Sequence, residues 1–157
     1  MNDAITLRAL ALIEGTDDPD GLRKIAANAR RQGNEVVARA AKLRLYSVLP
    51  SEEPGTLEYD VWQSIFALEG TLSEERGKTI RLSRTRQKIS RDLEQQTVED
   101  LVLGKQSEGF DLLVERDMGE LTFEALALRH PDRFEAAILD AAKSRLSAAG
   151  LDEQGKK

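Results

Sequence analysis

The sequence predicts an all-α protein, a bundle of about seven or eight helices that begins with an N-terminal helical hairpin. Apolar residues recur at helical spacing along nearly the whole chain, and runs that alternate apolar and polar residues are missing. One tryptophan, two tyrosines and four phenylalanines leave the core to leucine, alanine, isoleucine and valine, which favours helices over sheets. The length of 157 residues is that of one ordinary domain.

The N-terminal part is predicted to hold three helices. The first covers residues 4–14 and ends at the stretch GTDDPDG, which is rich in residues that interrupt helices. The second spans residues 19–32 and stops at Gly33, and Asn34 then caps a third helix that stops at Pro50. The second and third resemble a hairpin of the tetratricopeptide type, although one pair is not a repeat array.

A break in composition divides the chain. The stretch PSEEPGT has two prolines and a glycine in seven residues, so residues 51–56 are predicted to be a linker. It separates the helices of residues 1–50 from a larger helical bundle at residues 57–150, within what we expect to be one compact domain overall. Residues 151–157 are expected to be a polar tail without order.

The C-terminal part begins with the helix predicted to be the most buried. Thr56 can cap this helix, and its apolar residues between positions 57 and 72 fall within an arc of roughly 80°, which Trp62 and Phe66 widen. The helices expected after it cover residues 79–91, 97–104, 107–118, 122–129 and 131–149. Their expected core residues are Phe110, Leu113, Val114, Phe123, Leu126, Phe134, Ile138 and Leu146.

Charge is segregated along the chain. The formal net charge is −5, yet residues 76–91 hold seven bases and no acid, while residues 51–75 hold seven acids and no base. The seven bases, our candidate nucleic-acid-binding residues, are Arg76, Lys78, Arg81, Arg84, Arg86, Lys88 and Arg91. On a helix that begins near Thr79, four of them share an arc of about 80°, and an apolar cluster lies on another side. The four are Arg81, Arg84, Lys88 and Arg91, and the apolar cluster is Leu82, Ile89 and Leu93.

This basic segment favours contact with duplex DNA. Five of its seven bases are arginine, whose planar guanidinium binds phosphate or guanine at two points. No aromatic residue lies between Phe66 and Phe110, which argues against stacking on a single strand. Two alternatives stay open: a solvated face neutralised by the acids of residues 51–75, and contact with an acidic protein partner.

Part of the chain resembles a known helical module. The stretches SRTRQKI, EGF and LRHPDRF are similar to those of a module that accompanies the nuclease domain of bacterial endonucleases of the HNH and related types. The resemblance covers about residues 57–146, and it implies a bacterial protein that works near DNA, with a nuclease as a candidate protein partner. This chain has no second histidine, no His-Asn pair and no nuclease domain, so the resemblance implies no cleavage activity.

The residues predict no catalytic or metal site. His130 is the sole histidine and precedes a proline at a helix junction, where a structural hydrogen bond or a charge at the helix end is expected. The GKT at residues 77–79 lacks the upstream glycine of a phosphate-binding loop, and the aspartates of TDDPDG lack the loop length and terminal glutamate of an EF-hand. We therefore expect a protein that is not an enzyme and that needs no cofactor or metal.

Two functions remain from these observations. The first is a small DNA-binding protein that contacts duplex phosphates through a basic helix at residues 79–91. The second is a protein-interaction module, an adaptor or an inhibitor of a nucleic-acid enzyme, which uses the N-terminal hairpin or the acidic residues 92–128. The absence of cysteine, of a long apolar run and of a basic flank at the N-terminus predicts a cytoplasmic protein that does not contact membranes.

Overall fold

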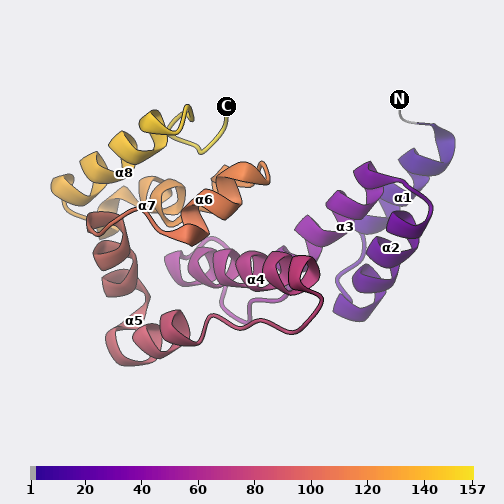
Figure 1. The fold of residues 1–157 in the computed structure, drawn as a ribbon, viewed down its shortest axis with the longest axis horizontal. Helices are drawn as coiled ribbons and strands as arrows, with labels where there is room; N and C mark the ends of the chain where they lie inside the picture. Colours follow the sequence, from indigo (N-terminus) through magenta and orange to yellow (C-terminus); the bar gives the residue numbers. More distant parts are fainter. Residues whose placement is uncertain (1–2) are drawn as a thin grey trace. The chain divides into compact units, whose positions relative to one another are not determined.

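Helices account for all the regular structure that we observe. The computed structural model describes residues 3–157, and within that range it contains eight α-helices, two short 3-10 helices and no strand (Figure 1). The all-α prediction is therefore confirmed. The helices fall into two units, Met1–Ser51 and Glu52–Lys157, which we describe separately.

Three helices form the N-terminal unit. They are α1 (Ala4–Glu14), α2 (Pro19–Arg31) and α3 (Glu35–Val48), and α3 packs against both of the others. Each helix begins at a polar residue whose side chain accepts a backbone N–H of the first turn; for α3 this is Asn34, as the sequence predicts. Gly33 has the left-handed φ of 73° between α2 and α3. Buried alanines contribute to the core of this unit: Ala26, Ala29, Ala38 and Ala41.

Five helices form the C-terminal unit. They are α4 (Leu57–Arg76), α5 (Ser83–Leu103), α6 (Glu108–Glu115), α7 (Phe123–Arg129) and α8 (Ala136–Ala148), with the 3-10 helices η1 (Gly119–Leu121) and η2 (Pro131–Arg133). Helix α4 packs against α5, α6 and α7, and its apolar side is buried as expected. Of the eight expected core residues, six are buried, while Val114 and Phe123 are half-buried against the core.

Helix α5 is bent sharply at Leu93 (Figure 1). Leu93 has φ 69° and ψ 172°, so residues 83–92 and 94–103 form two helical segments. The sequence prediction of helices at residues 79–91 and 97–104 is wrong at both starts: the first begins at Ser83, and Thr97 lies inside the second. The Thr97 hydroxyl donates to the Leu93 carbonyl at 2.8 Å instead of capping a helix. Leu93, predicted on the apolar face, is 67% exposed.

The C-terminal end of the chain packs against the bundle. Leu151 is buried against α6 and α8, and the Asp152 N–H donates to the Lys156 carbonyl at 2.7 Å. Gly155 lies against Gly119 of η1 so closely that neither position has room for a side-chain methyl group. The expectation of an unordered tail is therefore wrong. The last helix is also shorter than predicted, because the backbone is extended at Phe134 and Glu135 before α8 starts. None of the helices in residues 3–157 combines the length and apolar character needed to cross a bilayer.

Candidate nucleic-acid interface

The seven bases lie on the last turn of α4, on the connector of residues 77–82, and on the first segment of α5. The connector begins at Gly77, whose left-handed backbone (φ 67°, ψ 23°) ends α4. Its middle is held by Ser73 of α4, whose hydroxyl accepts the Ile80 N–H at 2.8 Å. Its end is held by Glu69, whose carboxylate accepts the Leu82 N–H at 2.8 Å. These bonds to α4 explain why the predicted helix does not start at Thr79.

Glu69 also binds Arg86, one of the seven bases. Two hydrogen bonds of 2.7 Å join the guanidinium to the two carboxylate oxygens, and the Arg86 guanidinium lies 5.2 Å from the Trp62 ring centre. Burial raises the pKa of the Glu69 carboxyl, but the bonds from Arg86 and the Leu82 amide outweigh burial, and the pKa lies below its ordinary value. Arg86 therefore has a structural role, and the carboxylate of Glu69 already neutralises its charge.

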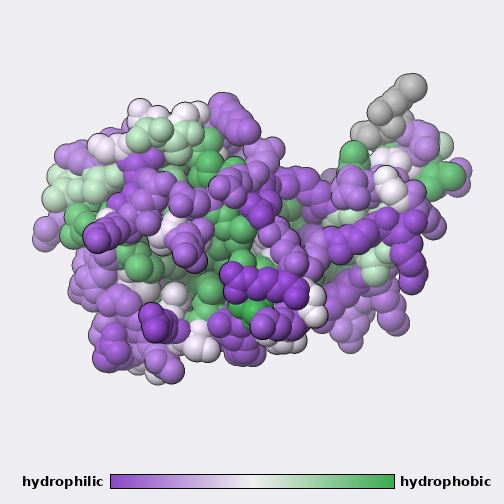
Figure 2. All heavy atoms as spheres, in the orientation of Figure 1, coloured by the Kyte–Doolittle hydropathy of each residue, from purple (hydrophilic) through white to green (hydrophobic). Residues whose placement is uncertain are grey.

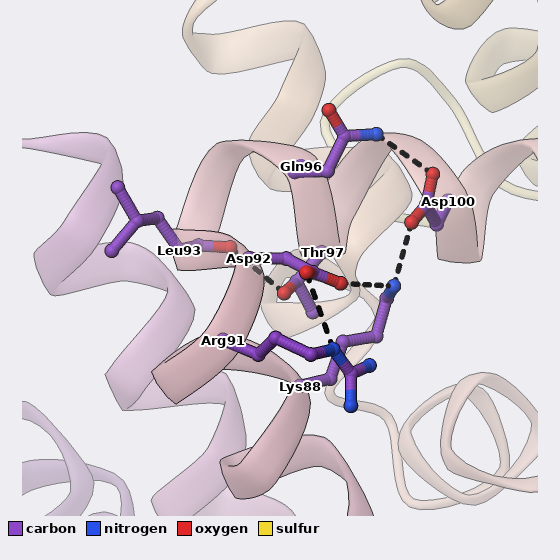
Figure 3. A network of polar contacts seen from close by, with 7 residues as sticks. All are labelled: Lys88, Arg91, Asp92, Leu93, Gln96, Thr97 and Asp100. Carbon is purple, nitrogen blue, oxygen red and sulfur yellow. Dashed lines mark hydrogen bonds and ion pairs between the residues drawn. The ribbon is translucent and has the colours of Figure 1, made fainter.

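Lys88 and Arg91 lie beside the bend of α5 (Figure 3). The Lys88 ammonium contacts Asp92 at 2.9 Å and Asp100 at 2.6 Å, so it bridges the two segments of the helix. Hydrogen bonds to Asp100 and Asp92 raise the pKa of Lys88 above its ordinary value. Arg91 contacts Asp92 at 3.3 Å, but its side chain stays 69% exposed.

Four bases remain that are exposed and make no ion pair with any residue in 3–157: Arg76, Lys78, Arg81 and Arg84. We call these the connector bases. They lie within nine consecutive residues, which span at most about 30 Å even when fully extended. Helix α5 begins beside them with no side-chain cap and no acid in its first turn. Its helix dipole therefore adds to the positive potential at this place.

The seven bases do not form the single basic helix face that the sequence predicts. Arg81 lies on the connector and Lys88 is paired, so Arg81, Arg84, Lys88 and Arg91 do not form one free basic face. The predicted pairing of these bases with the acids of residues 51–75 holds for Arg86 and Glu69. Glu75 instead binds Arg116, and Glu58 binds Arg133. The alternative of internal pairing thus accounts for Arg86 but leaves the connector bases available.

Ser73 and Glu69, which hold the connector, were not among the predicted site residues. Their roles depend on bonds to the backbone 7 and 13 residues further along the chain, a spacing with no local sequence signal. His130 contacts Asp60 at 2.7 Å, which is the structural hydrogen bond expected for it. No group of three or more potential metal-binding side chains was found in the described part of the chain.

Comparison of the chain with models of known families, with curated proteins and with solved structures finds no match.

Proposed function

We propose that the chain binds duplex DNA through the phosphate backbone, with the connector bases as its contact residues. The observation that carries this proposal is the set of four exposed cations without an ion pair in residues 3–157: Lys78 and Arg81 on the connector, which Ser73 and Glu69 hold against α4, and Arg76 and Arg84 on the adjoining helix ends. The four bases lie within at most about 30 Å along the chain, so the phosphates that they contact would lie within roughly one turn of the double helix. The resemblance to a module of HNH-type endonucleases supports the same class of partner.

The proposed interface has few side chains suited to recognising the edges of DNA bases. Three of its four residues are arginine, which suits two-point contact with phosphate, and the uncapped start of α5 suits the same anion. Because the chain as a whole has a net charge of −5, its other surfaces repel DNA and restrict contact to this segment. We therefore propose binding that depends strongly on salt and weakly on DNA sequence.

The test is the salt dependence of binding to a fluorescently labelled duplex, measured by anisotropy. If all four connector bases contact phosphates, log K against log[salt] has a slope of about −3.6, since each neutralised phosphate contributes about 0.9. The double substitution Arg81→Gln and Arg84→Gln should lower this slope by about 1.8. Glutamine keeps helix propensity at Arg84, so the fold should be unaffected.

Two control variants distinguish this interface from general charge. Lys24→Gln combined with Lys105→Gln removes the same charge from exposed positions elsewhere and should leave the slope unchanged. Lys88→Gln removes a base that Asp92 and Asp100 already neutralise, and it should change the slope less than Arg84→Gln does. Absence of binding at about 50 mM salt, or an equal loss in the Lys24/Lys105 control, would reject the connector as a DNA interface.

A second candidate function, protein interaction through the N-terminal unit, is favoured by a separate observation. Large apolar side chains are exposed on α1, where Ile5 is 73%, Leu12 60% and Leu7 55% exposed, and Val36 of α3 is 51% exposed. Exposed apolar groups in such number on α1 and at the start of α3 are typical of a surface that another protein covers.

This second function predicts a partner whose binding depends on α1 and not on the connector. Ile5→Ser with Leu12→Ser should abolish retention of that protein in affinity capture followed by mass spectrometry. The connector variant should retain it at the wild-type level. Equal retention by the wild type and the α1 variant would exclude this surface as the interface.

A further inference from the structure

The C-terminal unit contains a cavity whose walls share one residue, Arg76, with the proposed DNA contact. It lies among α4, α5, α6 and α7 and has a volume of about 310 Å³. This is at the lower end of the range for small-molecule sites, about 300–1,000 Å³. Taking about 30 Å³ for a water-sized group, the cavity has room for about ten non-hydrogen atoms.

The walls of the cavity are mainly apolar. Helix α4 contributes Ile65 and Leu68, α6 contributes Phe110 and Leu113, and α7 begins with Phe123 at its edge. Hydrophobic atoms are also visible over the C-terminal unit, framed by hydrophilic ones (Figure 2). Walls of this kind hold the apolar body of a ligand, while a few polar groups select its orientation.

One polar group in these walls lacks a partner. Ser64 of α4 is 1% exposed, lines the cavity, and its hydroxyl makes no hydrogen bond to any described residue. Two other hydroxyls of the unit are as deeply buried, and both are bonded: Thr97 to the Leu93 carbonyl and Thr122 to the Gly119 carbonyl, each at 2.8 Å. A serine inside a helix commonly bonds the carbonyl four residues earlier, which Ser64 does not. Its free hydroxyl therefore points to a hydrogen-bonding group of a bound molecule.

The charges around the cavity do not favour a charged ligand. Glu124 lines it, and burial raises the pKa of this carboxyl, but its carboxylate already accepts Arg145 at 2.7 Å. Arg145 donates in addition to the carbonyls of Leu101 and Gly104, so the two opposite charges are already paired with each other. At the exposed side, Arg76 and Glu108 have opposite charge. A charged molecule would lose its hydration on entering the cavity, and it would find no unpaired opposite charge there to offset that cost.

We propose that this cavity binds a small neutral molecule of about ten non-hydrogen atoms, mainly apolar, with one hydroxyl or carbonyl oxygen that bonds the Ser64 hydroxyl. The apolar walls take up the body of the molecule, and Ser64 supplies the one directional contact. The proposal does not depend on DNA binding, because Ser64 is not one of the connector bases.

A matched pair of probes tests this assignment: 4-ethylphenol, which is neutral near pH 7, and ethylbenzene, which lacks the hydroxyl. Binding is followed by the backbone amide shifts of the ¹⁵N-labelled full chain. We expect 4-ethylphenol to saturate with a Kd of about 1 mM or below and to shift amides around Ser64, Phe110 and Leu113. Ser64→Ala should weaken 4-ethylphenol about fivefold and leave ethylbenzene unchanged.

Ser90→Ala is the matched control, because Ser90 is an exposed serine on α5 outside the cavity, and it should leave both affinities unchanged. Three results would overturn the proposal. They are no saturation by 4-ethylphenol up to about 5 mM, shifts confined to residues away from the cavity, and equal affinity for 4-ethylphenol in the wild type and Ser64→Ala. The amide spectrum of each variant shows directly whether it is folded.

Discussion

Replacing Glu69 by glutamine tests whether this residue holds the connector in place. The Glu69 carboxylate accepts two bonds from Arg86 and one from the Leu82 N–H, and Glu69 is 8% exposed. Bonds to charged groups contribute about 1.5–3 kcal/mol each, and a glutamine amide retains one acceptor oxygen. The Arg86 side chain is 23% exposed, so water recovers part of what is lost. We expect Glu69→Gln to lower the free energy of unfolding by about 3 kcal/mol.

Urea unfolding followed by tryptophan fluorescence measures this loss, because Trp62 is the sole tryptophan and lies in the C-terminal unit beside Arg86. The control is Glu75→Gln on the same helix. Glu75 also binds an arginine at two points, both 2.6 Å, but the pair with Arg116 is 41% and 34% exposed. Solvent screens such a pair, so this variant should lose much less stability than Glu69→Gln.

The pH dependence gives a second test of the same pair. The folded-state pKa of Glu69 lies below its ordinary value, so its stabilisation is present above the unfolded-state pKa of about 4.3 and is lost as the pH falls through the folded-state pKa. The difference in stability between wild type and Glu69→Gln should therefore be constant near pH 7 and shrink below about pH 4.3. A Glu69→Gln loss no larger than that of Glu75→Gln, or a difference that does not change in acid, would refute the argument.

Three further predictions concern single positions. Leu93→Gly should raise the free energy of unfolding by about 1 kcal/mol, because the backbone angles of φ 69° and ψ 172° are strained for leucine and the side chain is 67% exposed. Urea unfolding measures this change. A loss of stability would mean that the contacts of the Leu93 side chain outweigh the backbone strain. Trp62→Ala should lower the free energy of unfolding, measured by circular dichroism, by about 3 kcal/mol, because it removes the contact with Arg86 and the hydrogen bond from Nε1 to Glu94 at 3.0 Å. Fluorescence of Trp62 that is readily quenched in the wild type would contradict this prediction. Limited proteolysis should cut first within residues 50–56, and a first cut after Leu151 would contradict the packing of Gly155 on Gly119.

Local signals were enough to predict the N-terminal unit. The predicted helix at residues 4–14 matches α1, and the cap at Asn34 and the stop at Gly33 are present, because caps and turn residues act within a few positions of themselves. The apolar side of α4 was likewise readable from its spacing.

The candidate site could not be predicted to the same extent. The connector leaves the helical conformation because Ser73 and Glu69, on another helix, bind its backbone, and helical periodicity contains no information on such bonds. The sequence shows seven bases as equivalent, whereas tertiary contacts engage Arg86 and Lys88 and leave the connector bases free. The unpartnered hydroxyl of Ser64 is visible only once α5, α6 and α7 are placed around α4.

The contact between Gly119 and Gly155 restricts how this sequence can change in evolution. The two positions are far apart in the chain, and at each a methyl group would collide with the backbone of the other, so a larger residue at one cannot be accommodated by a change of side chain at the other. Substitution requires the last turn to move off η1, which would also expose Leu151. Related chains that keep this backbone contact should therefore have glycine at both positions. Chains in which one glycine is replaced should tolerate replacement of the other as well.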